Sequence, residues 1–450
     1  MVDVCPFNYR YGSENMREVF SRDSMLRRYV QVEAAAMRGL EAAGLAPKGC
    51  WEEVLRCGSE LRPEDVDEVE ARLGHEMASL ATLLGERCGE CGKYVHLGLT
   101  SNDVIDTAWA LAFRDALRII LKRLEGVIEF LASLAVKHSR TVMVGRTHGV
   151  HAIPLTFGFK LANYVYELSR SYERLCEACG RVVKCNISGA VGTMAAWGGK
   201  GLTVRDVAAE ALRLEPHPIT TQIAPRDGFA ELLADLAILA SQLDRLALEV
   251  RELSRDEVGE AFIASGEVGS STMPHKRNPT LAERVSGLAK VARSFIIAGL
   301  ENIPLMHERD LTNSSSERVV IPHAFLTVDQ ALIDAEAILK HLVVDEEAMR
   351  RNLSITKGAV MSECVMVKLV LKAGMPRHEA HAALRKLRDE CIARGEDFLE
   401  AVRKAYGDLL GEELGECLNP ENYLGSAESL IHAALKHWEG VKGRCEGCWR

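Results

Sequence analysis

The stretch that decides the fold is TAWALAFRDALRIILKRLEGVIEFLASLAVKH, from Thr107 to His138. Apolar residues recur in it at every third or fourth position, which is the pattern of one long amphipathic helix. The same pattern returns in residues 232–253 and 281–295. Strand-type alternation is nearly absent, so the sequence predicts an all-α protein with a central bundle of long helices. Such helices need partners along their whole length, and a bundle shared by several subunits would supply them.

Turn-forming residues interrupt this pattern twice. Residues 92–102 end in an N-cap-like cluster directly before the first long helix. After Val343-Val344-Asp345 the helical patterns become shorter. The sequence therefore predicts an N-terminal helical domain over 1–99, a central long-helix bundle over 100–344 and a C-terminal helical domain over 345–450.

The composition is that of an ordinary globular protein. Of the 450 residues, 47% are apolar, which allows substantial burial. No apolar run is long enough to cross a bilayer, and the N-terminus lacks the basic-then-apolar order of a signal peptide. The net charge of −9 and the absence of a long basic run argue against a nucleic-acid partner. We therefore expect a cytoplasmic protein that binds neither membranes nor nucleic acid.

Cysteine is unusually frequent for a cytosolic chain, with thirteen residues, six of them in three C-x-x-C pairs. That spacing is compatible with zinc, with disulfides or with free thiols. Zinc is disfavoured because no histidine pair stands at zinc-finger spacing beside them. Disulfides are rare in the cytosol outside hyperthermophiles, and a content of only four glutamines favours a thermophile as the source. Disulfides and free thiols both remain open, and the pairing is undetermined. The pairs are Cys88/Cys91, Cys176/Cys179 and Cys445/Cys448.

The segment GEVGSSTMPHKRNP, residues 266–279, stands between two helical patterns and is too specialised for a simple connector. Its glycines allow backbone N–H groups to approach a ligand closely, and Ser270 offers a nucleophile or a base. Lys276 and Asn278 are suited to hold an anionic group. A carboxylate or phosphate substrate is the expected guest.

Other segments are dense in polar side chains, and each has a plain structural reading beside the functional one. His148 lies in GRTHGVHA, a polar turn before Pro154, and is either a solvated loop histidine or a general acid or base. Thr100-Ser101-Asn102-Asp103 is either a helix cap alone or also an anion site. The pair His75-Glu76 lies on a helical surface, and residues 307–318 carry two arginines around a serine cluster that suits a phosphate.

These segments occur together in a known family. The string GSSTMPHKRNP, residues 269–279, resembles the signature of the fumarase/aspartase superfamily. Within that superfamily the chain resembles the adenylosuccinate lyase family over nearly its whole length, from about residue 10 to LNPENYLGSAE at residues 418–428. The segments that carry the resemblance are Arg10-Tyr11, TSND, GRTHGVHA, Thr221-Gln222, PHKRNP and HERDLTNSSSER.

The resemblance implies a C–N lyase of purine biosynthesis. Members of that family release fumarate from adenylosuccinate, giving AMP, and from succinylaminoimidazole carboxamide ribotide. They use no metal and no organic cofactor, so none is expected here. They assemble as homotetramers whose active sites draw residues from three subunits, which suits the unpartnered helices of this chain.

The resemblance also implies roles for single residues. Ser270 is the general base, His148 the general acid, and His75 positions the substrate. Where the family usually has Arg-His-Asp this chain has Gly74-His75-Glu76, which puts the contacts around His75 in doubt. The implied succinyl contacts are Lys276, Asn278, Thr100 and Ser101; the phosphate and ribose contacts are Arg10, Tyr11, Arg309, Ser314 and Arg318; Gln222, Thr147 and Glu76 complete the substrate-binding set.

Two alternatives differ in kind from this reading. Another lyase of the superfamily, such as argininosuccinate lyase or a fumarase, would share the serine loop, but the Arg10-Tyr11 pair and the arginines of residues 307–318 serve no purpose for malate. A non-catalytic structural relative, as in some lens proteins, would have no need to keep Ser270, His148 and Lys276 together.

Overall fold

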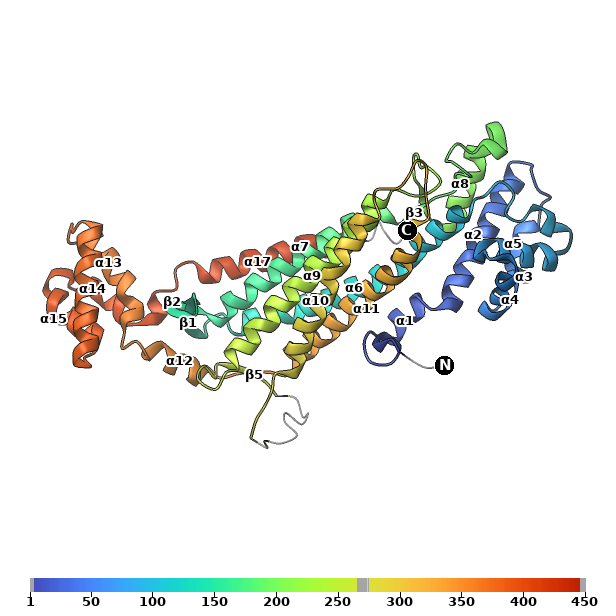
Figure 1. The fold of residues 1–450 in the computed structure, drawn as a ribbon. Helices are drawn as coiled ribbons and strands as arrows, with labels where there is room; N and C mark the ends of the chain where they lie inside the picture. Colours follow the sequence, from blue (N-terminus) through green and yellow to red (C-terminus); the bar gives the residue numbers. More distant parts are fainter. Residues whose placement is uncertain (1–3, 265–272, 274, 446–450) are drawn as a thin grey trace.

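The protein is an elongated helical body in this computed structural model, which describes residues 4–264, 273 and 275–445 (Figure 1). Long helices lie side by side along its centre, with a smaller helical unit at each end (Figure 1). The predicted all-α class is confirmed. The central helices are α6 (Ser101–Lys137), α7 (Phe157–Val182), α9 (Arg226–Leu253), α10 (Thr280–Glu301) and α11 (Thr312–Lys340).

Helix α6 is the predicted long helix and begins earlier than its apolar stripe. Leu117, Ile120, Leu124 and Ile128 are all completely buried, so the stripe faces the interior of the bundle. With 37 residues the helix is about 55 Å long, at 1.5 Å per residue. Its two ends therefore belong to distant parts of the molecule.

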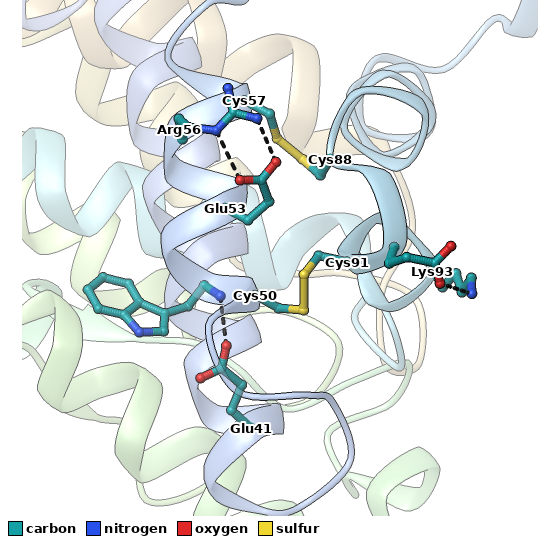
Figure 2. The surroundings of a disulfide bond; sticks show 10 residues. Glu41, Cys50, Glu53, Arg56, Cys57, Cys88, Cys91 and Lys93 are labelled. Carbon is teal, nitrogen blue, oxygen red and sulfur yellow. Dashed lines mark hydrogen bonds and ion pairs between the residues drawn. A yellow bond between two sulfur atoms is a disulfide. The ribbon is translucent and has the colours of Figure 1, made fainter.

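The N-terminal unit packs on the start of α6 and shares one hydrophobic core with the bundle. Two disulfides tie its helix α3 to the chain after α5, Cys50 to Cys91 and Cys57 to Cys88 (Figure 2). Helix α8 (Gly201–Leu212) packs against α2 on the same side. The elements of this unit are η1 (Pro6–Asn8), α1 (Glu14–Val19), α2 (Arg22–Ala42), α3 (Cys50–Gly58), α4 (Pro63–Leu73), α5 (Glu76–Arg87) and η2 (Gly89–Tyr94).

The C-terminal unit has its own core, which ends near Cys417. Helix α17 (Ala427–Val441) leaves that unit and packs on α7, where Trp438 is buried. Side-chain packing thus groups α17 with the bundle. The division that the sequence predicts at residue 345 follows chain order and places the same helix with the C-terminal domain. The remaining elements are α12 (Glu346–Ser354), η4 (Ala359–Met361), α13 (Ser362–Leu371), α14 (Arg377–Arg394), α15 (Phe398–Leu410), α16 (Glu413–Leu418) and η5 (Pro420–Asn422).

Disulfides are present, and none of the C-x-x-C pairs closes on itself. Cys176 on α7 bonds to Cys445, which fastens the end of the chain to the bundle, and Cys364 bonds to Cys417 inside the C-terminal core. Cys448 lies outside the described residues. The free thiols of the described chain are Cys5, Cys185 and Cys391.

Short strands join the helical segments without forming a large sheet. The hairpin of β1 (Val142–Thr147) and β2 (Val150–Thr156) was not predicted as strands, because its residues 145–152 read only as a polar turn. No helix in the described ranges has the length and apolar character that crossing a membrane requires. The other elements are β3 (Lys184–Cys185) paired with β4 (Glu215–Pro216), β5 (Ala261–Ile263) paired with β6 (Leu342–Val344), and η3 (Ala195–Lys200).

Candidate active site

The first turns of α5 and α6 bring His75 next to Ser101. His75 is the N-cap of α5, and its Nδ1 accepts a hydrogen bond from the amide of Ala78 at 3.3 Å. Because Nδ1 is the acceptor, the proton of the neutral ring lies on Nε2. That Nε2 lies 3.4 Å from Ser101 Oγ, to which it can donate. His75 and the start of α6 thus form one exposed polar surface.

A buried carboxylate fixes the start of α6. Asp103 accepts hydrogen bonds from the amides of Thr100 at 2.8 Å, Ser188 at 2.8 Å and Gly189 at 3.0 Å. Burial raises the pKa of Asp103 to about 7, while the three backbone donors favour its ionised form. The predicted cap at Thr100 is therefore present, and it also anchors the chain that follows β3.

Gln222 and Arg309 meet beside this helix start. Arg309 Nη1 donates to Gln222 Oε1 at 3.0 Å, and Gln222 Nε2 donates to the carbonyl of Ala190 at 3.0 Å. Burial lowers the pKa of Arg309, and nearby Asp106 opposes that shift. Its buried Nε has no hydrogen-bond partner within the described part of the chain. Arg309 is thus a half-buried cation with an unused donor, which is suited to an anionic ligand.

Glu76 and Arg318 join α5 to α11 across the same surface. Arg318 Nη2 lies 2.7 Å from Glu76 Oε2, with 56% of the arginine and 33% of the glutamate side chain exposed. Burial raises the pKa of Glu76, and the charge of Arg318 opposes that rise. The carboxylate of Glu76 therefore engages one terminal nitrogen of the Arg318 guanidinium. The family resemblance implies this same guanidinium as a ligand of the substrate phosphate.

The first turn of α11 carries Ser314. Just before this helix, Asp310 accepts hydrogen bonds from the hydroxyl of Thr312 at 2.5 Å, from its amide at 2.9 Å and from the amide of Met306 at 3.0 Å, and these bonds lower the pKa of Asp310. We call the surface around the first turns of α5, α6 and α11 the start end. Its residues are His75, Glu76, Thr100, Ser101, Gln222, Arg309, Ser314 and Arg318.

Arg10 and Tyr11 lie farther along α11. The ring of Phe7 packs on that of His323 at 5.1 Å between centroids, and the amide of Gly12 donates to Gln330 at 2.9 Å. Arg10 Nε donates to the hydroxyl of Tyr11 at 3.3 Å. These contacts place the pair one to three turns beyond Arg318, so the described chain does not gather all the expected phosphate ligands at one point.

His148 stands at the tip of the β1–β2 hairpin. It has φ 55°, Gly149 has φ 74°, and Thr147 pairs with Val150, which defines a two-residue turn with both central residues left-handed. Thr147 and His148 are exposed. With both central residues left-handed this is a type I′ turn, and it carries the exposed His148 imidazole at the tip of the hairpin. We call Thr147, His148 and their hairpin the hairpin end.

An ion pair joins the hairpin to the segment before the serine loop. Arg146 donates through both terminal nitrogens to Glu260, at 2.7 and 2.8 Å, and Glu260 is completely buried. Lys276 and Asn278 line an open cleft after that segment, together with Arg251. Ser270 lies outside the described residues, so its surroundings are not described.

The two ends lie at opposite ends of α6. The start end includes the first residue of that helix, whereas the hairpin follows its last turn, about 55 Å away at 1.5 Å per residue over 37 residues. Figure 1 places β1 and β2 beside the C-terminal unit and α5 at the other extremity. One chain by itself therefore does not bring His148 to His75.

Comparison with known proteins relates this geometry to characterised families. A family model described as lyase matches residues 9–293, and one described as adenylosuccinate lyase C-terminus matches residues 358–434. An adenylosuccinate lyase of Pyrococcus abyssi is 45% identical and covers 98% of this chain and 99% of its own length. The chain belongs to the adenylosuccinate lyase family.

Further relatives agree with this assignment. An adenylosuccinate lyase of Methanothermobacter thermautotrophicus is 41% identical over 96% of this chain and 98% of its own length. A solved 3-carboxy-cis,cis-muconate lactonizing enzyme of Pseudomonas putida has a TM-score of 0.88 and 31% identity, covering 98% of this chain and 100% of its own. The fumarase-like fold is therefore shared with a lactonizing enzyme as well.

In this adenylosuccinate lyase family member Gly74 and Glu76 each have a defined local place. Gly74 ends α4 with φ 68°, a left-handed C-cap that glycine adopts without steric cost. The nearby Glu76 reaches Arg318, which gives a contact between α5 and α11.

Sequence reasoning missed the charges beneath the start end. Asp106, Arg226 and Glu317 form a buried ion cluster with side chains 0%, 2% and 5% exposed. Two signals were available. Asp106 interrupts an apolar stretch of α6, and Arg226 stands in the first turn of α9, where the helix dipole disfavours a cation.

Proposed function

We propose that this protein cleaves the C–N bond of adenylosuccinate to give AMP and fumarate, and performs the same β-elimination on succinylaminoimidazole carboxamide ribotide. The observation that carries the proposal is the nearly full-length match to adenylosuccinate lyases. Retention of His148, Lys276 and Asn278 together with Ser270 supports an active enzyme over a structural relative.

The reaction divides between a base and an acid. Ser270, as its alkoxide, removes the proton from the carbon next to a succinyl carboxylate, and the negative charge spreads onto that carboxylate. Collapse of this charge forms the double bond of fumarate and expels the nitrogen. His148 supplies the proton that the departing nitrogen takes. Loop N–H groups and Lys276 would stabilise both the alkoxide and the developing charge, because such preorganised donors act most strongly where water is excluded.

The remaining residues hold the two anionic halves of the substrate. Thr100, Ser101, Lys276 and Asn278 bind the succinyl carboxylates, with His75 positioning the substrate through its Nε2. The half-buried guanidinium of Arg309, with its unused Nε donor, supports a role in binding the nucleotide phosphate. The nucleotide contacts that we assign are Arg10, Tyr11, Arg309, Ser314 and Arg318, with Gln222, Thr147 and Glu76 completing the pocket.

Each complete site is formed by several subunits of a homotetramer in this proposal. The length of α6 supports it, because about 55 Å of helix separates the start end from the hairpin end at 1.5 Å per residue over 37 residues. Apolar side chains exposed along α9 and α10 would be covered in such an assembly. They are Ile238, Leu248, Val291, Ile297 and Leu300. The protein would act in the cytoplasm, where its nucleotide substrates are made.

Fumarate release from the purified protein tests the function directly. We expect turnover of adenylosuccinate and of succinylaminoimidazole carboxamide ribotide, with no turnover of argininosuccinate or malate. Activity confined to argininosuccinate or malate would overturn the nucleotide assignment, and inactivity on all four would favour a non-catalytic relative.

A further inference from the structure

We infer that Arg226 is a positioning residue that holds the starts of α6, α9 and α11 in the arrangement the substrate requires. The inference rests on the proposed function and adds to it three residues, Asp106, Arg226 and Glu317, that touch no substrate in the proposed site. They act through the residues beside them on each helix.

All five N–H donors of Arg226 are used. Nη1 and Nη2 donate to the two oxygens of Asp106 at 2.9 and 2.7 Å, and Nε and Nη2 donate to the two oxygens of Glu317 at 2.8 and 3.2 Å. Nη1 also donates to the carbonyl of Ala224 at 2.9 Å. A lysine has three donors on a single nitrogen and has no planar fork, so it cannot replace these contacts.

The two carboxylates are tied further into their own surroundings. Asp106 accepts from the amide of Ala224 at 2.8 Å and from the side-chain amide of Asn102 at 3.2 Å. Glu317 accepts from the side-chain amide of Asn313 at 2.9 Å. Because these groups are buried and mutually satisfied, the cluster fixes one relative placement of the three helices.

Each helix start carries substrate residues of the proposed site. Asp106 lies just over one turn after Ser101 on α6, Arg226 follows Gln222 by four residues, and Glu317 is flanked by Ser314 one turn before it and by Arg318 next to it. A shift of any of these helices by one ångström would misplace its ligands, and such displacements are costly to catalysis.

The charges of the cluster also act on Arg309. Two carboxylates and one guanidinium leave a net charge of −1 in a buried place. Arg309 is attracted by Asp106 and, less strongly, by Glu317, and it is repelled by Arg226. Arg309 itself donates to Gln222 at 3.0 Å, four residues before Arg226. Neutralising either carboxylate would remove the surplus negative charge near Arg309.

Glu317 should affect one half of the substrate, whereas Asp106 should affect both. Glu317 supports the first turn of α11, with Ser314 and Arg318, which is on the nucleotide side. Asp106 supports the start of α6, whose Thr100 and Ser101 are on the succinyl side, and it also holds the amide of Ala224 and attracts Arg309. A merely structural role of Glu317 would weaken both halves equally.

Binding of the two products separates these roles. We would measure AMP binding by calorimetry and fumarate as an inhibitor, for the wild type, Glu317→Gln, Asp106→Asn and Arg226→Lys. Loss of one charged hydrogen bond corresponds to about 10-fold or more in affinity. Glu317→Gln should weaken AMP binding by about that factor and leave fumarate inhibition within about threefold, whereas Asp106→Asn and Arg226→Lys should each weaken both.

Asp244→Asn is the matched control. Asp244 is a carboxylate of α9 with 24% of its side chain exposed, and it also pairs with an arginine, Arg293 at 3.0 Å, but it lies five turns after Arg226 on the same helix. We expect it to lower the melting temperature without changing either product affinity. Arg226→Lys keeps the test decisive if either neutralised carboxylate variant fails to fold.

The outcomes distinguish this inference from the function on which it rests. A wild type that neither turns over adenylosuccinate nor binds AMP overturns the function. An active wild type overturns the positioning role of the cluster if its Glu317→Gln or Asp106→Asn variant keeps both affinities, or if its Glu317→Gln variant loses both by the same factor.

Discussion

The start end and the hairpin end of the same chain are supported in different ways. At the start end, Asp103 and the ion cluster of Arg226 are buried beneath an exposed polar surface. The hairpin end presents His148 on an exposed two-residue turn, and the bidentate pair of Arg146 and Glu260 ties it to β5. The difference teaches that buried charges lie beneath the proposed substrate residues of the start end, whereas the proposed acid stands at an exposed tip.

In the proposed assembly each site needs both ends, and this gives the largest expected effect. His148→Gln should reduce kcat by about 100-fold or more, because a general acid contributes about 10² to 10⁴. His75→Ala should cost about 100-fold, because it leaves the substrate misplaced. When the two variants are mixed and their subunits exchange, about one quarter of the wild-type activity should return. With random pairing, one in four sites formed between chains receives an intact His148 from one chain and an intact His75 from another. Fumarate release after subunit exchange measures this, and zero recovery after confirmed exchange would show that each chain forms its own site.

The anchor of the hairpin gives the next effect. Arg146→Met leaves Glu260 buried without its cation, which should cost about 3–5 kcal/mol of unfolding free energy and lower kcat with little change in KM. Denaturant unfolding measures the loss of unfolding free energy, and steady-state kinetics measure kcat and KM. This variant should restore activity when mixed with His75→Ala but not with His148→Gln.

Arg181→Met is the matched control for that variant. Arg181 also makes a bidentate pair, with Glu231 at 2.6 Å, but its side chain is 50% exposed. Its loss should cost about 1 kcal/mol or less. Equal effects of the two substitutions would contradict the importance of burial at Glu260.

The disulfides distinguish the two ends in stability. The start end is backed by Cys50–Cys91 and Cys57–Cys88, and none of the described disulfides lies in the hairpin. Replacing Cys57 and Cys88 by serine should lower the unfolding free energy by about 2–4 kcal/mol. Calorimetric melting with and without reductant measures this, and thiol titration of the denatured oxidised protein should find far fewer than thirteen thiols. A full count without reductant would contradict the disulfides.

The contact between Glu76 and Arg318 should give the smallest effect. Glu76→Asp shortens the side chain by one methylene and breaks a half-exposed pair, which is worth about 1 kcal/mol at most. We expect a change in KM for adenylosuccinate of about fivefold or less. Glu70→Asp, on the same cavity wall, should leave KM unchanged. A large loss of kcat in Glu76→Asp would place Glu76 in the chemistry itself.

The sequence predicted most of the fold because each long helix has a local sequence pattern of its own. The apolar stripe of residues 107–138 and the cap at Thr100 are one-dimensional patterns with a direct structural meaning. The hairpin around His148 was predicted only as a turn, since its strands are short and both pack on the C-terminal unit. The cysteine pairing could not be predicted either, because in each described disulfide the two cysteines lie on different elements.

The sequence by itself determined the helical class, the family and the polar segments expected at the site, because those are written as periodicity and as ordered motifs. Only the tertiary structure decided that these segments fall into two groups at opposite ends of a helix about 55 Å long, at 1.5 Å per residue over 37 residues. It also decided that Asp106, Arg226 and Glu317 meet, since the burial of a charge depends on which helices pack together, and spacing along one chain does not contain that information.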